Sequence, residues 1–303
     1  MAIQPGPMRA DALAGKRILV TGGGTGLGRE LANGFLRHGA RVHICGRRGN
    51  KLDAAVEVMS AEHGPRISAH RVDVRDADEV DAMMSAIWEA GPLTGLINNA
   101  GANFIAPTKE LSSRGYEAVR STVMDGSFFC TLACGRRWIS DGLPGSIVSN
   151  LVTWVWTGSA FVVPAAMAKT AVHAMTMSLA VECGPYGIRL NAVAPGPFPT
   201  ESAWEKLNPL PDTAVGATQP DQVPLRRYGR LAELINLMVF LQSDGCDYLT
   251  GQTIAIDGGH HLAAPSTFAD LASLTDEQWQ RARDAIQAAS ARDKKDRSTP
   301  QKQ

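Results

Sequence analysis

The residues best suited to chemistry are glycines that follow a short apolar run. The segment Thr21–Gly28 reads TGGGTGLG and comes directly after Arg17–Val20, which has the branched residues of a strand. Such glycines permit a tight turn, close approach of the backbone to a pyrophosphate, and close helix–strand packing. The N-terminus of the following helix favours phosphate. We therefore expect a dinucleotide site, the alternative being a glycine turn kept for packing. The expected contacts within the string are Gly22, Gly24, Thr25, Gly26, Leu27 and Gly28.

The charge after the second strand predicts which dinucleotide binds. An acidic residue at that place bonds the ribose 2′-hydroxyl of NAD, whereas arginine accepts the 2′-phosphate of NADP. Residues 44–48 read ICGRR and contain no acid. We therefore expect NADP(H) as the cofactor, held by Arg47 and Arg48. For Arg48 the alternative is a solvated charge at the start of a helix.

These residues need a framework, and the chain alternates strand-like with helix-like segments. This alternation is typical of βαβ units and of a parallel sheet covered by helices on both faces. We expect one α/β domain, a doubly wound parallel sheet (Rossmann fold). The expected strands are Arg17–Val20, Arg41–Cys45, Ile67–Val74, Gly95–Asn98, Gly145–Val152, Ile188–Val193 and Gln252–Ile256. The expected helices include Glu30–His38, Lys51–His63, Glu79–Ala90 and Ala165–Glu182.

Two segments interrupt or extend that alternation. Residues 198–224 are rich in proline and weakly periodic, and a long irregular loop in a compact domain is more often functional than accidental. After the last expected strand, Thr275–Gln278 has the form of a capping box. We expect an N-terminal tail at 1–12, an NADP-binding domain at 13–262, and an extension at 263–303 with one helix and a disordered tail. The apolar stripe of that helix is Trp279, Ala282, Ile286 and Ala289.

Composition argues against several classes of protein. The 30 basic and 30 acidic residues cancel, so nothing favours nucleic acid or an anionic membrane as a partner. No run is long enough to span a membrane, and the N-terminus lacks a signal-peptide core. Five scattered cysteines are typical of reduced thiols in a cytoplasmic protein. We interpret Cys130 and Cys134 as buried apolar residues, and we expect no metal site there or at His260-His261.

Further motifs resemble a known family. Asn98-Asn99-Ala100-Gly101 follows another apolar run, and Lys169 lies in a helical stretch. With the glycine string these resemble the short-chain dehydrogenase/reductase family, whose signature is TGxxxGxG, then NNAG, then YxxxK. The resemblance implies more contacts with the cofactor, including the nicotinamide ribose. They are Asp73, Val74, Asn99, Ala100, Gly101, Lys169, Pro195, Gly196, Phe198 and Thr200.

The chain departs from the family where the proton relay belongs. Most members use Asn, Ser, Tyr and Lys, with the tyrosine as acid and the lysine lowering its pKa. At these places stand Asp125, Val152, Ala165 and Lys169. Because only the lysine remains, the sequence argues against the ordinary tyrosine-driven exchange of alcohol and ketone.

Residues 102–108 read ANFIAPT, and residues 157–164 read TGSAFVVP. With the glycine string, these segments resemble one branch of the family that lacks this tyrosine, the 2,4-dienoyl-CoA reductases, and the resemblance covers about residues 15–260. In the family, the place of residues 198–224 holds the substrate-covering loop. Mitochondrial members take their proton from a tyrosine earlier in the chain. Trp154 occupies that place here, and an indole cannot donate a proton as a general acid. The resemblance implies that Arg75 meets the CoA portion, the alternative being a solvated charge that opens a helix. It also implies a substrate site with Asn103, Phe104 and Trp154. The neighbouring trans-2-enoyl-CoA reductases look similar around Asn103 and Phe104.

Reduction of an enoyl thioester needs hydride at carbon, stabilisation of charge on the thioester oxygen, and a proton that water can supply. Lys169, with Thr153 or Asn150, could stabilise the oxyanion, and Asp125 could donate if burial raised its pKa. The alternatives are a backbone-bonded hydroxyl for Thr153 and a helix kink or water-binding group for Asp125. We predict an NADPH-dependent reductase of a 2,4-dienoyl- or 2-enoyl-CoA. A dehydrogenase/reductase for another carbonyl or hydroxyl substrate, or a cofactor-binding protein without turnover, are the alternatives.

Assembly is implied by the same resemblance. Family members of this type pair through the helix that carries Asp125 and the helix that carries Lys169. Residues 165–181 are apolar on more than one face, as expected for a helix buried by both the sheet and a partner. We therefore expect a homotetramer.

Overall fold

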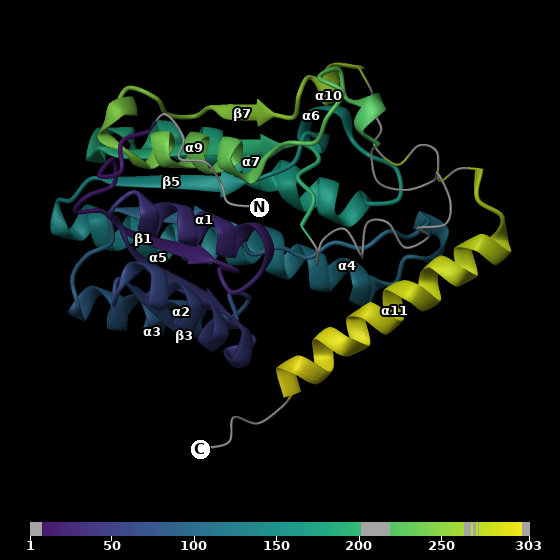
Figure 1. The fold of residues 1–303 in the computed structure, drawn as a ribbon, viewed down its shortest axis with the longest axis horizontal. Helices are drawn as coiled ribbons and strands as arrows, with labels where there is room; N and C mark the ends of the chain where they lie inside the picture. Colours follow the sequence, from purple (N-terminus) through teal and green to yellow (C-terminus); the bar gives the residue numbers. More distant parts are fainter. Residues whose placement is uncertain (1–7, 201–218, 264–267, 269–270, 272, 299–303) are drawn as a thin grey trace.

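A single parallel sheet forms the centre of the molecule. The computed structural model describes residues 8–200, 219–263, 268, 271 and 273–298, except for the side chains of 293–298. Seven strands follow the order β3-β2-β1-β4-β5-β6-β7, and every pair is parallel (Figure 1). This is the doubly wound order, so the predicted Rossmann fold is confirmed. The strands are β1 Arg17–Thr21, β2 Arg41–Gly46, β3 Ile67–Arg71, β4 Gly95–Asn98, β5 Gly145–Asn150, β6 Ile188–Pro195 and β7 Thr253–Ile256.

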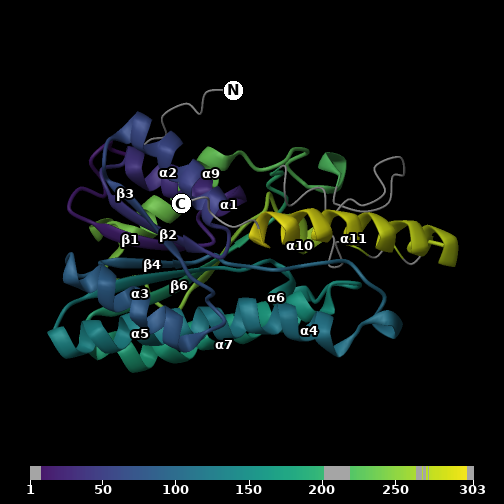
Figure 2. The same ribbon diagram turned by 90° about the horizontal axis from the view of Figure 1, so that it is seen from below.

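Helices cover both faces of the sheet. Figure 2 shows α1, α2 and α9 on one face and α3, α5 and α7 on the other. Phe35, Leu52 and Met238 belong to the core of the first face, and Met84 and Trp138 to that of the second. The helices of these layers are α1 Gly26–Arg37, α2 Gly49–His63, α3 Ala77–Glu89, α5 Gly126–Asp141, α7 Val163–Cys183 and α9 Leu231–Gln242. The shorter helices near the cleft are α4 Ser113–Arg120, α6 Trp154–Thr157 and α10 His260–Ala263.

Two strands end earlier than their composition predicts. β3 stops at Arg71 rather than Val74, and β5 stops at Asn150 rather than Val152. In both places the chain leaves the ladder at the carboxyl edge of the sheet although branched or apolar residues follow, Val72 and Val74 after β3 and Leu151 and Val152 after β5. Branched residues favour extended backbone but do not mark where a neighbouring strand ceases to pair. Most of the expected substrate loop, residues 201–218, lies outside the described residues.

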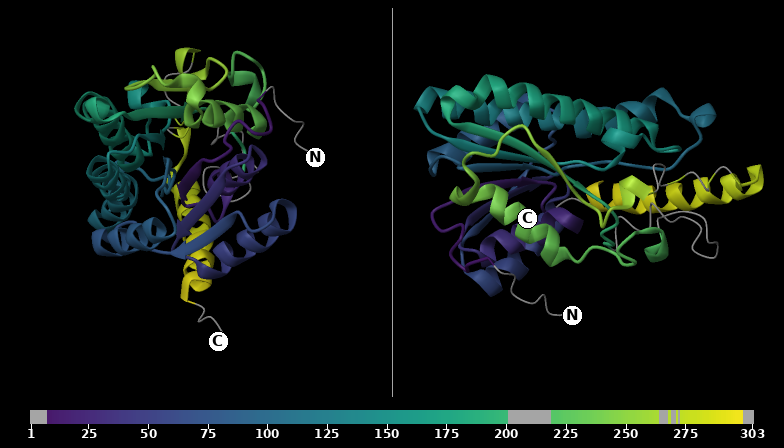
Figure 3. Two further views of the ribbon diagram at one scale, coloured as in Figure 1. Left: turned by 90° about the vertical axis from the view of Figure 1, so that its left-hand side faces the viewer. Right: turned by 90° about the horizontal axis from the view of Figure 1, so that it is seen from above.

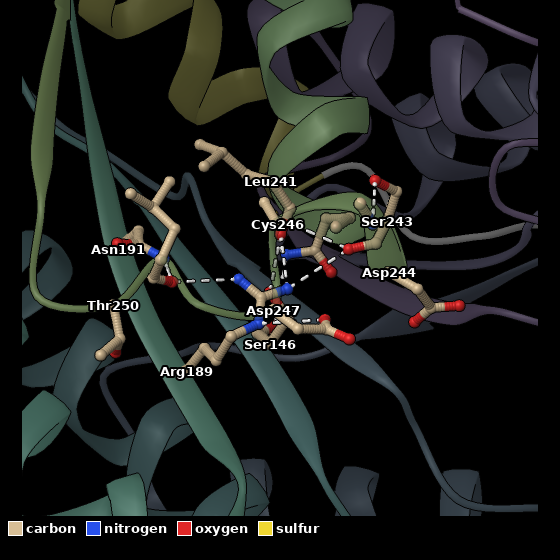
Figure 4. Close-up of polar contacts among 12 residues, drawn as sticks. Ser146, Arg189, Asn191, Leu241, Ser243, Asp244, Cys246, Asp247 and Thr250 are labelled. Carbon is tan, nitrogen blue, oxygen red and sulfur yellow. Dashed lines mark hydrogen bonds and ion pairs between the residues drawn. The ribbon is translucent and has the colours of Figure 1, made fainter.

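At the amino ends of the strands, one arginine connects several segments. Arg189 lies near the start of β6 and donates to the carbonyl oxygens of Leu241 and Leu249, at 3.0 and 3.3 Å. Its Nε lies 3.7 Å from a carboxylate oxygen of Asp247 (Figure 4). These contacts tie the end of α9 and the segment before β7 to the amino end of β6.

The extension ends in a long helix, α11 Asp276–Ser298. The backbone N–H of Thr275 donates to Gln278 Oε1 at 2.8 Å, and the N–H of Gln278 donates to Thr275 Oγ1 at 3.3 Å, which is the capping-box arrangement. The helix continues to Ser298, whereas the sequence from 293 onward favoured a tail. Figures 1 and 3 show α11 beyond the carboxyl ends of the strands, near α4.

Candidate active site

The glycine string forms a tight turn between β1 and α1. Gly22 and Gly26 have φ of +67° and +56°, a conformation that side chains rarely adopt. A Cβ on Gly28 would lie 2.4 Å from the carbonyl oxygen of Gly22 and 2.5 Å from Nδ2 of Asn99. The first turn of α1 carries no acidic residue. The turn therefore presents backbone N–H groups at a helix N-terminus, which suits the pyrophosphate of a dinucleotide.

Thr21 fastens the second motif to this turn. Its Oγ1 accepts hydrogen bonds from the backbone N–H groups of Asn99 and Ala100, both at 2.9 Å. Asn99 Nδ2 donates to the Thr21 carbonyl at 3.0 Å, and Asn150 Nδ2 donates to Asn99 Oδ1 at 3.0 Å. Side chains thus connect the ends of β1, β4 and β5. The two glycine-containing motifs therefore form one continuous surface at the carboxyl ends of these strands.

A cleft of about 1780 Å³ opens at this edge of the sheet. Small-molecule sites usually measure roughly 300–1,000 Å³, so this cleft has room for a dinucleotide and a second molecule. Expected cofactor residues in its lining are Thr25, Leu27, Arg47, Arg48, Asp73, Gly101, Lys169, Pro195, Gly196 and Phe198. Expected catalytic and substrate residues in its lining are Arg75, Asn103, Phe104, Asp125, Thr153 and Trp154.

Other expected cofactor residues lie behind that lining. They are Gly22, Gly24, Gly26, Gly28, Val74, Asn99, Ala100 and Thr200. The Val74 side chain is buried, and a Cβ on Gly126 would lie 2.7 Å from it, so only its backbone is available to a ligand. Thr200 Oγ1 is buried without a hydrogen-bond partner among the described residues. An unpaired buried hydroxyl is costly unless a ligand or water bonds it.

Basic side chains stand at the end where the adenosine would lie. Arg47 and Arg48 line the cleft after β2, and Arg48 Nη2 donates to Thr25 Oγ1 at 3.1 Å. Arg75 Nε donates to both carboxylate oxygens of Asp73 at 2.9 Å. Burial alone would raise the pKa of Asp73, but the Arg75 hydrogen bonds and the Arg47 charge lower it overall. The Asp73 carboxylate is therefore an anion that fixes Arg75 at the cleft wall.

At the catalytic positions an apolar wall replaces the expected hydroxyl groups. Ala165 is 4% exposed and lines the cleft, with Val152 in the same wall. Lys169 is half-buried one helical turn further along α7, and its Nζ donates to the carbonyl oxygen of Asn150. Burial lowers the pKa of Lys169 to about 8. The lysine is therefore tied to the end of β5, and Ala165 stands four residues before it on α7.

Asp125 ends a π-helical turn, Ser121–Asp125, between α4 and α5. Both of its carboxylate oxygens accept hydrogen bonds from Arg120 Nη1, at 2.7 and 2.9 Å. A carboxylate held in this way by a guanidinium can also accept hydrogen bonds from water. The helical irregularity and the pair with Arg120 fit a water-binding group better than a proton donor.

An apolar cluster that includes residues of the extension forms part of the cleft lining. Trp154 packs edge-on against Phe268, with ring centroids 5.6 Å apart, and Phe161 lies 5.1 Å from Trp279. Both tryptophans, Phe268 and Ala165 are buried in this cluster. Arg283 in α11 is also ion-paired with Glu110. The extension contributes Phe268, Ile286, Gln287, Ser290 and Ala291 to the lining of the cleft.

Two buried amide oxygens lie in the lining without partners. Asn150 Oδ1 and Asn103 Oδ1 have no hydrogen-bond partner among the described residues. Buried polar groups are normally paired, so these atoms fit a cleft completed by a polar ligand. Together with the glycine turn and the unpaired Thr200 hydroxyl, they show that the residues present fit a nicotinamide dinucleotide.

Several residues of the cleft were not identified from the sequence. His260, Arg114 and Gln287 all line it. Burial lowers the pKa of His260, so this imidazole is neutral at ordinary pH. Arg114 stands in the first turn of α4, next to the Ser112 cap. No local signal marks these residues, because their positions depend on how α4, α10 and α11 meet the sheet.

Comparison with known proteins gives the class. Residues 22–261 match a family model described as enoyl-(acyl carrier protein) reductase. The chain is 34% identical to a probable (3E)-enoyl-CoA-producing 2,4-dienoyl-CoA reductase of Caenorhabditis elegans over 296 residues, 95% of this chain and 94% of that protein. The protein therefore belongs to the short-chain dehydrogenase/reductase family of oxidoreductases.

Two further relatives place it within that family. It is 37% identical to a probable (2E)-enoyl-CoA-producing 2,4-dienoyl-CoA reductase of Bacillus subtilis, covering 82% of this chain and 97% of the relative. A gluconate 5-dehydrogenase from Burkholderia cenocepacia, solved with NADP and tartrate, superposes with a TM-score of 0.77 at 30% identity, covering 84% of this chain and 99% of that one. The family fold binds a nicotinamide cofactor, and the relatives include dienoyl-CoA reductases.

Metal clusters and membrane-spanning helices are absent from the residues that the structure describes. No group of three or more His, Cys, Asp or Glu among them could hold a metal ion. No helix in the described part of the chain is long and apolar enough to cross a membrane. Cys130 and Cys134 are buried free cysteines, and burial raises the pKa of both thiols.

Proposed function

We propose that the protein is an NADPH-dependent reductase of conjugated acyl-CoA thioesters, either 2,4-dienoyl or 2-enoyl, that works without the family tyrosine. The observation that carries this proposal is the apolar wall at Ala165. A ketone reductase needs an acid at that wall, whereas an acyl chain needs an apolar surface. Trp154, Phe104 and Phe268 continue that surface toward the extension.

The cofactor part of the proposal rests on charge. Arg47 and Arg48 follow β2 in the cleft lining, and no acidic residue occupies that turn. Guanidinium groups suit the 2′-phosphate of NADP. The NADP-bound relative is consistent with this choice. When bound, the dihydronicotinamide would supply hydride to a carbon of the conjugated chain.

The chain itself must hold the thioester oxygen and provide for a proton. In this proposal Lys169 contacts the nicotinamide ribose and, with Thr153, stabilises charge that gathers on the oxygen. Asp125, held by Arg120, accepts hydrogen bonds from the water that protonates carbon. Replacing Asp125 by Asn would break the ion pair and lower turnover while leaving NADPH binding near that of the wild type.

The substrate's CoA portion would lie along the basic side of the cleft. Arg75 and Arg114 both line the cleft. Their guanidinium groups would bind the phosphates of the CoA nucleotide. The unpaired Oδ1 of Asn103 would accept a hydrogen bond from an amide N–H of the pantetheine arm. This assignment leaves the apolar end, next to α11, for the acyl chain.

The test is NADPH oxidation with purified protein and a panel of substrates. We expect turnover with a 2,4-dienoyl-CoA or a 2-enoyl-CoA, and none with simple ketones or gluconate-type polyols. Analysis of the product by NMR would show whether a dienoyl-CoA yields the 3-enoyl or the 2-enoyl product. Turnover restricted to ketones or polyols would favour a different carbonyl or hydroxyl substrate, as the gluconate 5-dehydrogenase relative would suggest. Tight NADPH binding with no turnover of any of these substrates would favour a cofactor-binding protein without catalysis.

We also expect assembly into a homotetramer in the cytoplasm. Apolar side chains are exposed on the two helices expected to pair, among them Phe128 on α5 and Met167, Met177 and Val181 on α7. Exposed apolar patches of this kind often mark interfaces between subunits. A strictly monomeric protein in light scattering at micromolar concentration would contradict this expectation.

A further inference from the structure

A row of arginines stands at the amino ends of three neighbouring strands. Arg17 begins β1 and is the register partner of Arg41, which begins β2. The backbone N–H of Val42 donates to the carbonyl oxygen of Arg66, the residue just before β3, at 2.8 Å. Neighbouring strands lie about 4.8 Å apart. The backbone therefore brings three guanidinium groups to one part of the sheet, at the end opposite to the cofactor cleft.

These arginines line a cavity of about 410 Å³. This volume lies within the roughly 300–1,000 Å³ of ordinary small-molecule sites. His43 and Ser68, register partners on β2 and β3, belong to the lining. The complete lining is Arg17, Arg41, His43, Pro65, Arg66, Ile67, Ser68 and Ala90.

The positive charge in this cavity has no counter-charge in the described part of the chain. No carboxylate of the described residues forms an ion pair with Arg17, Arg41 or Arg66. Arg66 donates to two backbone carbonyls, while Nε of Arg17 is buried and has no hydrogen-bond partner. Burial and the neighbouring Arg41 charge both lower the pKa of Arg17. The uncompensated charge thus disfavours the arrangement unless an anion enters.

Arg189 provides a reference within the same sheet. It also lies near the amino end of a strand, yet it donates to carbonyl oxygens of Leu241, Ser243 and Leu249 and faces Asp247 (Figure 4). An arginine kept for structure at this edge is therefore surrounded by acceptors. Arg17 is not, although it too stands beside the end of a helix, α3.

A hydrogen bond to His43 fixes the orientation of the Arg17 guanidinium. Arginine can only donate, so His43 Nε2, 3.3 Å from Arg17 Nη2, is the acceptor of that contact. The ring proton is then on Nδ1, which can donate to Ser68 Oγ at 2.8 Å. Burial, with help from His70 and the nearby arginines, lowers the pKa of His43 to about 4. The imidazole is therefore neutral, so His43 neither adds positive charge to the cavity nor offsets the charge of the arginines.

We propose that this cavity is a second anion site, which binds a phosphate group, either free or carried as a monoester by a small metabolite. Three guanidinium forks supply more donors than the two oxygens of a single carboxylate can accept. A phosphate presents three or four oxygens in different directions and takes charge-assisted hydrogen bonds from each arginine. This site is separate from the proposed reductase chemistry and does not depend on it.

The test uses protein saturated with NADP, so that the arginines after β2 are already occupied. Isothermal titration with inorganic phosphate and with glycerol phosphate should each give one site per chain. Tighter binding of glycerol phosphate would identify a metabolite monoester, and equal or tighter binding of inorganic phosphate would identify the free ion. Tighter binding of citrate than of either phosphate probe would overturn the assignment to phosphate.

Two variants make the result specific. Arg17→Gln should weaken phosphate binding at least tenfold, and Arg41→Glu should abolish it by placing a carboxylate among the remaining arginines. Arg281→Gln, which removes an exposed arginine of α11 outside the cavity, should bind as the wild type does. Unchanged binding in Arg41→Glu, or no binding by the wild type at millimolar phosphate, would overturn the proposal.

Thermal unfolding provides a second readout that a purely structural role would not give. Phosphate should raise the melting temperature of the NADP-loaded wild type, because a ligand of the folded state stabilises it. Arg41→Glu should melt higher than the wild type without phosphate and should not respond to it. Because Arg41 is exposed, this variant keeps the test valid if Arg17→Gln folds poorly. A lower melting temperature for Arg41→Glu would count against the proposal.

Discussion

The two ends of the active-site cleft are built by different means. At the nucleotide end, positive-φ glycines and the hydroxyl of Thr21 fix backbone groups. At the end that we propose for the acyl chain, side chains from separate elements, such as Trp154 and Phe268, make the wall. A backbone-built site tolerates little change, because almost any side chain added at Gly28 would collide with the turn. The side-chain wall depends on contacts between separate elements, so we expect substitutions there to change the site more than the fold.

The largest effect should come from the charge at the nucleotide end. Replacing Arg47 by Asp should weaken NADPH binding by one to three orders of magnitude, about 1.5–4 kcal/mol, since a charge-assisted pair with the 2′-phosphate becomes repulsive. Binding of NADH should change far less. Fluorescence titration of both cofactors measures this. Arg71→Asp, at an exposed position outside the cleft lining, is the control. Equal affinity of the wild type for NADPH and NADH would contradict the argument from charge.

Lys169 lies between the two ends of the cleft, and its titration should appear in the pH dependence of both activity and stability. With a folded pKa of about 8, Lys169 loses its proton above that pH, so kcat/KM should fall about tenfold per pH unit there. Stability has the opposite sign. The lysine pKa is 10.5 in the unfolded chain, so the unfolded state binds more protons between about 8 and 10.5, and folding should become more favourable as pH rises.

Lys169→Met should remove both dependences and lower activity across the range. Activity against pH and melting temperature against pH are the two measurements. A kcat/KM that stays level from pH 7 to 10 in the wild type would mean that the charge of Lys169 is not used.

At the acyl end, the extension should affect the substrate and leave the cofactor alone. Trp279 is 6% exposed and packs on Phe161. Truncating a buried tryptophan costs about 3–5 kcal/mol, enough to detach a helix that depends on that contact. Trp279→Ala, and deletion of residues 264–303, should raise the KM for acyl-CoA about tenfold with NADPH affinity near that of the wild type. Gln280→Ala, an exposed neighbour, is the control. Unchanged kinetics and assembly in the deletion would reduce α11 to a surface helix.

The smallest change is expected at the missing acid. Ala165→Tyr would place a phenol where we propose that the acyl substrate or a water lies, so turnover of acyl-CoA should fall or stay the same. Steady-state assays with acyl-CoA and with a ketone measure this. A large gain in ketone reduction with no loss on enoyl-CoA would indicate that the site is an ordinary one that has lost its tyrosine.

The parallel sheet and the glycine turn between β1 and α1 could both be predicted from the amino-acid sequence. These depend on short-range requirements, namely branched runs, glycine conformations and residue identity at fixed spacing. The pair of Asp125 with Arg120 was not predicted, because it needs a π-helical turn that no propensity marks. For Arg75 the sequence left two alternatives open, a ligand contact or a solvated charge. In the structure, the hydrogen bonds to Asp73 hold the Arg75 guanidinium at the cleft wall.

Contacts between segments that are far apart in the chain could not be predicted from local patterns. Nothing local to Trp279 indicates that it meets Phe161, since the contact depends on where α11 leaves the domain. The arginine row likewise appears only when β1, β2 and β3 are set in register, because residues 17, 41 and 66 are far apart in the chain. Local patterns fix the conformation of each segment, whereas burial and register, which are shared between segments, fix the chemistry where segments meet.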